Sequence, residues 1–336
     1  MTDLGKAVRS RLVERACIKG VSLVERRESP RDGTVKFLFG LSDGLRIETV
    51  LIPPASAFAG TQPAPDNEQQ RRTICVSTQA GCPLDCAFCA TATMGYRRNL
   101  DAGEIVDQIL HVQRESRRPI TNVVFMGMGE PMMNYDNVMN AVGIITGGMG
   151  IAGRRITIST AGWVDGIRRM ADDGCRARLA VSLHSAVDAT RTFLMPVNKR
   201  YALAALADAL AYYYAKTHDR VTYEVIFFDG INDSDADVRA LTQLARRVPS
   251  KINVIPYHSI AFAHPTGPGA HLRPSPRVEA IVETLRRNHL TVLVRSNAGD
   301  DIAAACGQLA VTTPRARGSR RPATRAHAQA PTPMHA

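Results

Sequence analysis

The chain has 336 residues, of which 45% are hydrophobic, and this is enough for one large domain or two small ones with a substantial core. No run of eighteen apolar residues occurs, and residues 1–6 are acidic and polar where a signal peptide would need an apolar stretch. We therefore expect a cytoplasmic protein without a membrane partner, and the net charge of +11 favours a polyanionic one.

Two β-branched runs near the N-terminus predict a β-hairpin. They cover residues 35–41 and 45–52 and are separated by the turn sequence Ser42-Asp43-Gly44. Residues 53–72 then read as a polar, Pro-rich loop. We interpret residues 1–72 as a short N-terminal extension.

Between residues 73 and 311, short β-branched runs alternate with helical patterns, as in β/α units on a parallel sheet. The predicted strands are 73–78, 122–126, 155–159, 178–183, 222–228, 252–256 and 291–295, and the clearest helices are 102–114, 202–214 and 278–288. The polar residues of interest fall repeatedly just after strands, where a barrel places its chemistry. The sequence therefore favours an α/β fold with a partial (β/α)6 TIM-type barrel over a doubly wound sheet.

Three cysteines follow the first of these strands, in the spacing Cys82-x3-Cys86-x2-Cys89. A structural zinc site needs four ligands, whereas three thiolates fit an iron–sulfur cluster that keeps one iron open. The alternatives are chance burial and, in an oxidising compartment, a disulfide. Three cysteines within eight residues, next to Gly81 and Pro83, favour the cluster.

Glycine and polar residues also end the second, third and fourth barrel strands. Glycines there let backbone amides approach a ligand, and a buried carboxylate accepts hydrogen bonds from an ammonium group. Each motif alone is equally consistent with ordinary strand capping. Their repeated position at one mouth favours a shared small-molecule site. The residues are Gly129, Glu130, Ser159, Ser182, Leu183 and His184.

Four more cysteines, Cys17, Cys75, Cys175 and Cys306, lie outside the triplet. A lone cysteine is usually an inert small hydrophobe, so each taken singly reads as a packing residue.

Residues 312–336 form a basic tail with five arginines, no acid and no apolar periodicity, which predicts disorder. A solubilising end and a nucleic-acid contact both remain open as its role.

Six motifs, spread in order from about Arg46 to Ala310, together resemble the radical S-adenosylmethionine RNA adenine methyltransferases, the RlmN/Cfr family. The motifs are residues 75–82 (CVSTQAGC), 97–100 (RRNL), 125–131 (FMGMGEP), 158–162 (ISTAG), 181–184 (VSLH), and 299–301 (GDD) through 307–309 (GQL).

The resemblance implies a 4Fe-4S cluster on Cys82, Cys86 and Cys89, whose open iron chelates S-adenosylmethionine. The six strand-end residues given above would contact that cofactor. His258 stands where the family usually has an asparagine that also contacts it, and an imidazole is able to donate one hydrogen bond in its place.

The resemblance also implies roles for three residues outside that site. An adenine carbon is too weak a nucleophile to attack a sulfonium methyl, so the family first loads the methyl on a cysteine, here Cys306 as S-methylcysteine. Its methylene radical adds to the adenine and tethers the enzyme to RNA. Glu48 would be the proton acceptor, and Cys75 would release the product by forming a transient disulfide with Cys306.

The expected function is methylation of an adenine carbon in RNA, with carbon 2 favoured over carbon 8. The expected substrates are 23S rRNA and also tRNA, the electron donor a protein such as flavodoxin, and the oligomeric state a monomer. Family members usually carry an N-terminal helical accessory domain, for which the roughly thirty residues before Val35 are too few, so we expect it to be incomplete.

Two other functions stay open at this point. One is a radical enzyme with a substrate other than RNA, such as a peptide or a small metabolite. The other is a basic RNA-binding protein with a purely structural cluster, which would leave Cys75 and Cys306 without a purpose.

Overall fold

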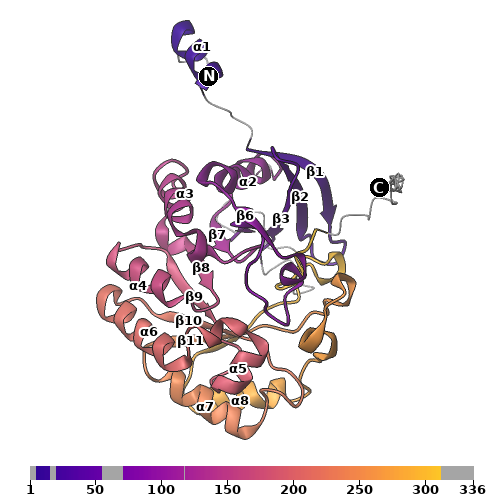
Figure 1. The fold of residues 1–336 in the computed structure, drawn as a ribbon, viewed down its shortest axis with the longest axis vertical. Helices are drawn as coiled ribbons and strands as arrows, with labels where there is room; N and C mark the ends of the chain where they lie inside the picture. The colour runs from indigo at the N-terminus through magenta and orange to yellow at the C-terminus, as the bar shows by residue number, and fades with distance from the viewer. Residues whose placement is uncertain (1–4, 16–19, 55–70, 117, 312–336) are drawn as a thin grey trace, which may run out of the picture.

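The computed structural model describes residues 5–15, 20–54, 71–116 and 118–311 (Figure 1). The predicted tail 312–336, most of the predicted loop 53–72 and Cys17 lie outside the described residues. Within the described ranges, every helix is too short or too polar to span a bilayer.

One ten-stranded sheet runs through the molecule in the order β1-β2-β3-β4-β7-β8-β9-β10-β11-β12. From β4 to β12 each strand is parallel to its neighbour. The parallel strands are β4 (Thr73–Cys75), β7 (Asn122–Phe125), β8 (Ile156–Thr160), β9 (Arg178–Ser182), β10 (Val221–Val225), β11 (Ser250–Val254) and β12 (Val292–Val294). All seven predicted barrel strands are confirmed, and with them the partial barrel.

A helix follows each parallel strand before the next one begins, and the helices cover the outer side of the curved sheet (Figure 1). They are α2 (Ala102–Glu115), α3 (Tyr135–Gly147), α4 (Val164–Asp172), α5 (Asp188–Leu194), α6 (Leu203–Thr217), α7 (Asp235–Ala245) and α8 (Val278–Arg287). The three predicted helices correspond to α2, α6 and α8.

Helix α2 shows how local sequence fixes these elements. Asp101 and Glu104 form a capping box, in which each side chain accepts from the other's backbone N–H, at 2.7 and 3.0 Å. Ile105, Ile109 and Val112 then repeat at helical spacing and are all fully buried. The capping box therefore fixes the start of α2 at Ala102, and the buried residues fix the face that packs on the sheet.

The N-terminal extension is a three-stranded antiparallel meander of β1 (Val21–Glu28), β2 (Val35–Leu41) and β3 (Arg46–Ile52). The predicted hairpin is confirmed as β2 and β3. Strand β1 was not predicted, because seven of its eight residues are exposed and its sequence lacks an alternating pattern. The separate helix α1 (Lys6–Arg15) was not predicted either.

The extension is continuous with the barrel, since β3 pairs antiparallel with β4. Asp107 on α2 also accepts from the backbone N–H groups of Gly20 and Val21, both at 2.9 Å. The division into residues 1–72, 73–311 and 312–336 remains a prediction.

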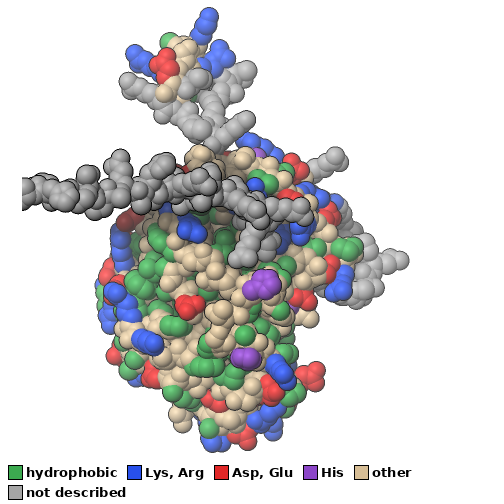
Figure 2. Space-filling model, turned by 45° about the vertical axis from the view of Figure 1, so that its right-hand side comes forward, with side chains coloured by type: hydrophobic (Ala, Val, Ile, Leu, Met, Phe, Trp, Pro, Cys, Tyr) green, Lys and Arg blue, Asp and Glu red, His purple; other side chains and the backbone are tan. Residues whose placement is uncertain are grey.

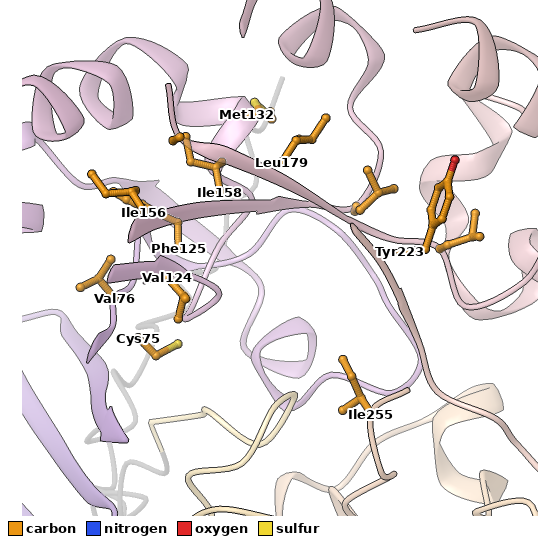
Figure 3. Close-up of a cluster of buried hydrophobic side chains, with 14 of the residues drawn as sticks. Cys75, Val76, Val124, Phe125, Met132, Ile156, Ile158, Leu179, Tyr223 and Ile255 are labelled. Carbon is orange, nitrogen blue, oxygen red and sulfur yellow. The ribbon is translucent and has the colours of Figure 1, made fainter. Parts of the chain in front are cut away.

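Buried side chains from successive strands pack together along the sheet. Figure 3 shows Val124, Phe125, Ile156 and Ile158 packed along the sheet, with the Cys75 thiol directed to the side on which Ile255 lies. On the face shown in Figure 2, hydrophobic and uncharged side chains occupy much of the middle and basic ones lie mostly around its edge.

Candidate active site

A cavity of about 140 Å³ lies at the C-terminal ends of strands β7 to β10; we call it the first cavity. It brings together the cysteine triplet and most of the strand-end residues predicted from the sequence. Its predicted lining residues are Cys82, Cys86, Cys89, Gly129, Glu130, Ser159, Ser182, His184 and Cys306. Leu183 is fully buried and does not line the cavity with its side chain.

The triplet lies on a tight segment between β5 (Gln79–Gly81) and β6 (Tyr96–Asn99), which pair antiparallel. Gly81 has φ +77°, and a Cβ there would collide with the carbonyl oxygen of Gly95, so only glycine fits. The Cys82 N–H donates to that same oxygen at 3.3 Å. The pairing of β5 with β6 and this hydrogen bond hold the three half-buried cysteines at one wall of the cavity.

The donor set fits an iron–sulfur cluster. No three His, Cys, Asp or Glu side chains in the described ranges converge closely enough to bind a single metal ion. A 4Fe-4S cluster makes no such demand, because each thiolate binds a different iron. Burial raises the pKa of the Cys82 thiol to about 12, and coordination to a metal is what deprotonates a thiol in such surroundings.

Glu130 is buried at the mouth and held by backbone donors. Its carboxylate accepts from the N–H of Met132 at 3.0 Å and of Ala161 at 2.7 Å. Burial raises the pKa of this carboxyl, and these donors oppose the rise. The preceding Gly129 has φ +101°, and a Cβ there would clash with Gln79. Only glycine therefore fits at this position beside the cavity.

His184 and two serines add polar groups that face a ligand. Burial lowers the pKa of His184 to about 3, so the ring is neutral. Its Nδ1 accepts from the Ile226 N–H at 3.1 Å, which leaves the proton on Nε2. The half-buried hydroxyls of Ser159 and Ser182 have no partner in the described part of the chain and are free to bind a ligand.

A second cavity of about 70 Å³ adjoins the first, sharing Met126, Ile255, Cys306 and Gly307 with it. Cys75 lies in this second cavity, so two cysteines more than two hundred residues apart in sequence face the same space. Burial raises the pKa of Cys75 to about 12. It also raises the pKa of Cys306, and the positive charge of Arg295 opposes that rise.

His258 lies in the second cavity and does not line the first. Its Nδ1 is 2.9 Å from Oδ1 of Asp300, in the segment that leads to Cys306. A contact between His258 and the cofactor remains a prediction.

Glu48 is buried next to the segment that carries Cys306. One carboxylate oxygen lies 3.1 Å from Nζ of Lys36, and the other accepts from the Ala310 N–H at 3.1 Å. Lys36 donates in turn to the carbonyl of Ala303 at 3.1 Å. The pair therefore holds the chain on both sides of Cys306. Burial raises the pKa of Glu48, and Lys36 opposes the rise.

The chain is similar to known proteins over most of its length. A model of the radical SAM superfamily matches residues 76–241. The probable dual-specificity RNA methyltransferase RlmN of Flavobacterium psychrophilum is 44% identical over 317 residues, covering 92% of this chain and 85% of the relative. The dual-specificity RNA methyltransferase RlmN of Anaeromyxobacter dehalogenans is 40% identical, covering 92% and 80%.

The chain belongs to the RlmN family. A crystal structure of a radical SAM methyltransferase from Sphaerobacter thermophilus superposes with a TM-score of 0.81 at 40% identity, covering 92% of this chain and 86% of that one. This RlmN family member is therefore a radical SAM methyltransferase, and membership implies S-adenosylmethionine and an iron–sulfur cluster as cofactors.

Two residues of this site were missed in the sequence. Arg295 lines the second cavity, with Nη1 3.6 Å from Oε1 of the buried Glu224. Arg295 lies at the C-terminal end of the last predicted strand. Ser159 and His184 were identified as site residues because they lie at the same end of their own strands. Lys36 lies beside Glu48 in the predicted hairpin. Opposite charges on two paired strands indicate an ion pair, so this contact could have been predicted from the sequence.

Proposed function

We propose that this enzyme methylates an adenine carbon in RNA, with carbon 2 favoured over carbon 8 and with 23S rRNA and also tRNA as substrates. The observation that carries the proposal is the position of Cys306, which faces both the triplet and Cys75. A methyl carrier needs this position, because it must meet the methyl donor on one side and a resolving thiol on the other. The names of the relatives support RNA as the substrate class.

The proposed cofactors are a 4Fe-4S cluster on Cys82, Cys86 and Cys89, and S-adenosylmethionine beside the strand-end residues of the first cavity. When bound, they supply the methyl group and the radical chemistry that activates it. Electrons would come from a protein such as flavodoxin, and the enzyme would act as a monomer.

The chain's own residues then carry the methyl and release the product. The Cys306 sulfur holds the carbon that becomes bonded to the adenine. Glu48, one hydrogen bond from Ala310, accepts the proton that the adenine carbon loses, and the unpaired electron of the adduct would pass to a one-electron acceptor, a role that the oxidised iron–sulfur cluster would fill. The Cys75 thiolate attacks the Cys306 sulfur, so an S–S bond forms and the bond from sulfur to carbon breaks. The electron pair stays on that carbon, which takes up a proton and becomes the methyl group.

The test uses purified, reconstituted protein with RNA and methyl-labelled S-adenosylmethionine. We expect label in a methyladenosine, identified by mass spectrometry of digested RNA, and on Cys306 before RNA is added. The Cys306→Ala variant should give neither. Unlabelled RNA together with an unlabelled Cys306 in the wild type would overturn the proposal, and label on Cys306 with a different final acceptor would overturn the RNA substrate alone.

A further inference from the structure

A surface hollow of about 1220 Å³ opens beside the segment that carries Cys306; we call it the outer hollow. Stretches far apart in the sequence form its walls: the start of β3, the chain just after the cysteine triplet, a loop after β11, and the end of the described chain. The lining residues are Gly44, Leu45, Arg46, Ala80, Gly81, Thr93, Met94, Arg97, Phe262, Ala263, His264, Ala310 and Val311.

The charges of the outer hollow are unbalanced. Arg46 and Arg97 are both exposed, and neither guanidinium has an ion-pair or hydrogen-bond partner in the described ranges. The nearby Arg98, in contrast, is paired with Asp43 and Glu104. None of the residues that line the hollow is acidic. Two unpaired guanidinium groups at the edge of a concave surface suit a ligand with several negative charges.

The outer hollow also presents an exposed aromatic ring. The Phe262 side chain, on the loop opposite β3, is 37% exposed and lines the hollow. Part of this ring is therefore open to the hollow, and exposed rings stack on unpaired bases in proteins that bind single-stranded nucleic acid. Proteins that bind single-stranded RNA combine arginines that contact the phosphates with aromatic rings that stack on the bases.

The position of the outer hollow connects it with the chemistry. Ala310 forms part of its wall, and the Ala310 N–H donates to Glu48. Arg46 and Val311 line both this hollow and the adjoining one that contains Glu48 and Lys36. Ala310 follows Cys306 by four residues, so a strand lying in the outer hollow contacts the segment that carries Cys306 and that hydrogen-bonds the proposed proton acceptor.

We propose that the outer hollow binds the unpaired RNA strand that flanks the target adenine, with Arg46 and Arg97 on its phosphates and Phe262 stacked on a neighbouring base. The inference rests on the proposed function, because it assumes RNA as the substrate. It adds the surface that holds the strand and the residues that do so.

The test measures binding of the full, reconstituted chain to an oligoadenylate of about 12 nucleotides, over a range of salt concentrations. The double variant Arg46→Gln/Arg97→Gln should bind about tenfold or more weakly at 0.15 M salt, and the slope of log affinity against log salt should fall by about 0.7 for each phosphate that is no longer neutralised. Phe262→Ala should weaken binding by about tenfold and leave the slope unchanged.

Arg239→Gln is the matched control. Arg239 is exposed on α7, where it lines a different hollow that also contains Asp235, and α7 lies at the other end of the molecule from β1–β3 (Figure 1). This variant should bind as the wild type does. Methylation of Cys306 without RNA should be unchanged in all variants, which shows that they fold and load the methyl.

Two outcomes separate this inference from the proposed function. Unchanged affinity and salt slope in the double variant, with RNA still methylated by the wild type, would overturn the outer hollow as the RNA surface and leave the function standing. Binding that depends on the two arginines, in a wild type that methylates no RNA, would support the surface and overturn the function.

Discussion

The two cavities that meet at Cys306 are built in different ways. The first is formed by neighbouring strand ends, and each contributes a short motif that lies where its own strand stops. The second combines Cys75 on β4, Arg295 after β12 and a C-terminal segment that the N-terminal sheet holds in place. The cofactor region is thus assembled locally, and the region for methyl transfer and release from distant parts of the chain.

This difference implies that the two regions fail in different ways. Damage to the first cavity should stop the reaction before it begins, because every later step needs the cofactors. Damage to the second should leave radical formation intact and stop the reaction at a defined stage. The following variants test this separation.

The largest effect is expected for Cys86→Ser in the first cavity. Loss of one thiolate should prevent assembly of the cluster, so the iron–sulfur absorbance and 5′-deoxyadenosine should both fall below detection. Cys175→Ser is the control, because Cys175 is half-buried outside both cavities, and this variant should keep both signals. Production of 5′-deoxyadenosine by Cys86→Ser would contradict the assignment of the ligand.

Cys75→Ala should block release and leave the earlier steps intact. Without the resolving thiol, the adduct between Cys306 and RNA persists, so RNA should co-purify covalently with the protein and turnover should cease. Gel mobility before and after nuclease digestion measures the adduct. The double variant Cys75→Ala/Cys306→Ala should carry no RNA, and normal turnover by Cys75→Ala would refute the two-cysteine mechanism.

Lys36→Met should strongly lower the free energy of unfolding, by about 3–5 kcal/mol near pH 8, because it leaves the buried Glu48 carboxylate without its partner. The raised pKa of Glu48 gives the sign of the pH dependence. A protonated carboxyl is easier to bury, so the deficit should shrink toward pH 5.

Urea unfolding at the two pH values measures this effect. The double variant Lys36→Met/Glu48→Gln removes the buried charge and should recover most of the lost stability. An equal deficit at pH 5 and pH 8 would show that the Lys36 charge does not act through Glu48.

Arg295→Gln should slow release by roughly 10- to 100-fold, since the positive charge of Arg295 favours the Cys75 thiolate and a charge-assisted interaction is worth about 1.5–3 kcal/mol. The pKa of Cys75, about 12, implies that its thiolate fraction rises with pH. Release from the adduct in a single turnover should therefore quicken about tenfold per pH unit between pH 7 and 9 in the wild type. The variant should be slower at each pH with the same slope, and a pH-independent wild-type rate would contradict this assignment.

Thr91→Val gives the smallest expected effect and tests the link between the two regions. The Thr91 hydroxyl, two residues after Cys89, donates to the Leu309 carbonyl at 2.6 Å. Losing this bond should cost about 1 kcal/mol of stability and lower product formation a few fold, and because Thr91 also lines the first cavity next to Cys89, 5′-deoxyadenosine should fall to a similar extent. Thr146→Val is the control, because Thr146 bonds only within α3. Unchanged product formation by Thr91→Val would show that this bond does not link the two regions.

The features that could be predicted from the sequence are the local ones. The barrel strands follow from β-branched runs, and the first cavity follows from motifs that each end one strand. The second cavity depends on contacts between residues that no local pattern connects, such as Lys36 with Ala303 and Glu48 with Ala310. Cys75 and Cys306 were paired only through the family resemblance, and Arg295 was missed although it ends a predicted strand. Strand β1 was not predicted, because its side chains are mostly exposed and its sequence has no alternating hydrophobic pattern.

The anchoring of the Cys306 segment has a consequence for how the enzyme is made. The contact of Lys36 with Ala303 spans 267 positions, so these N-terminal strands leave the ribosome long before their partner is synthesised. All the barrel strands precede Ala303 in the chain, so they have been synthesised before this contact is able to form. The strand ends of the first cavity are complete earlier, and the methyl-carrying cysteine docks last. An unfinished chain would thus have a place for the cofactors but no positioned thiol to receive the methyl group.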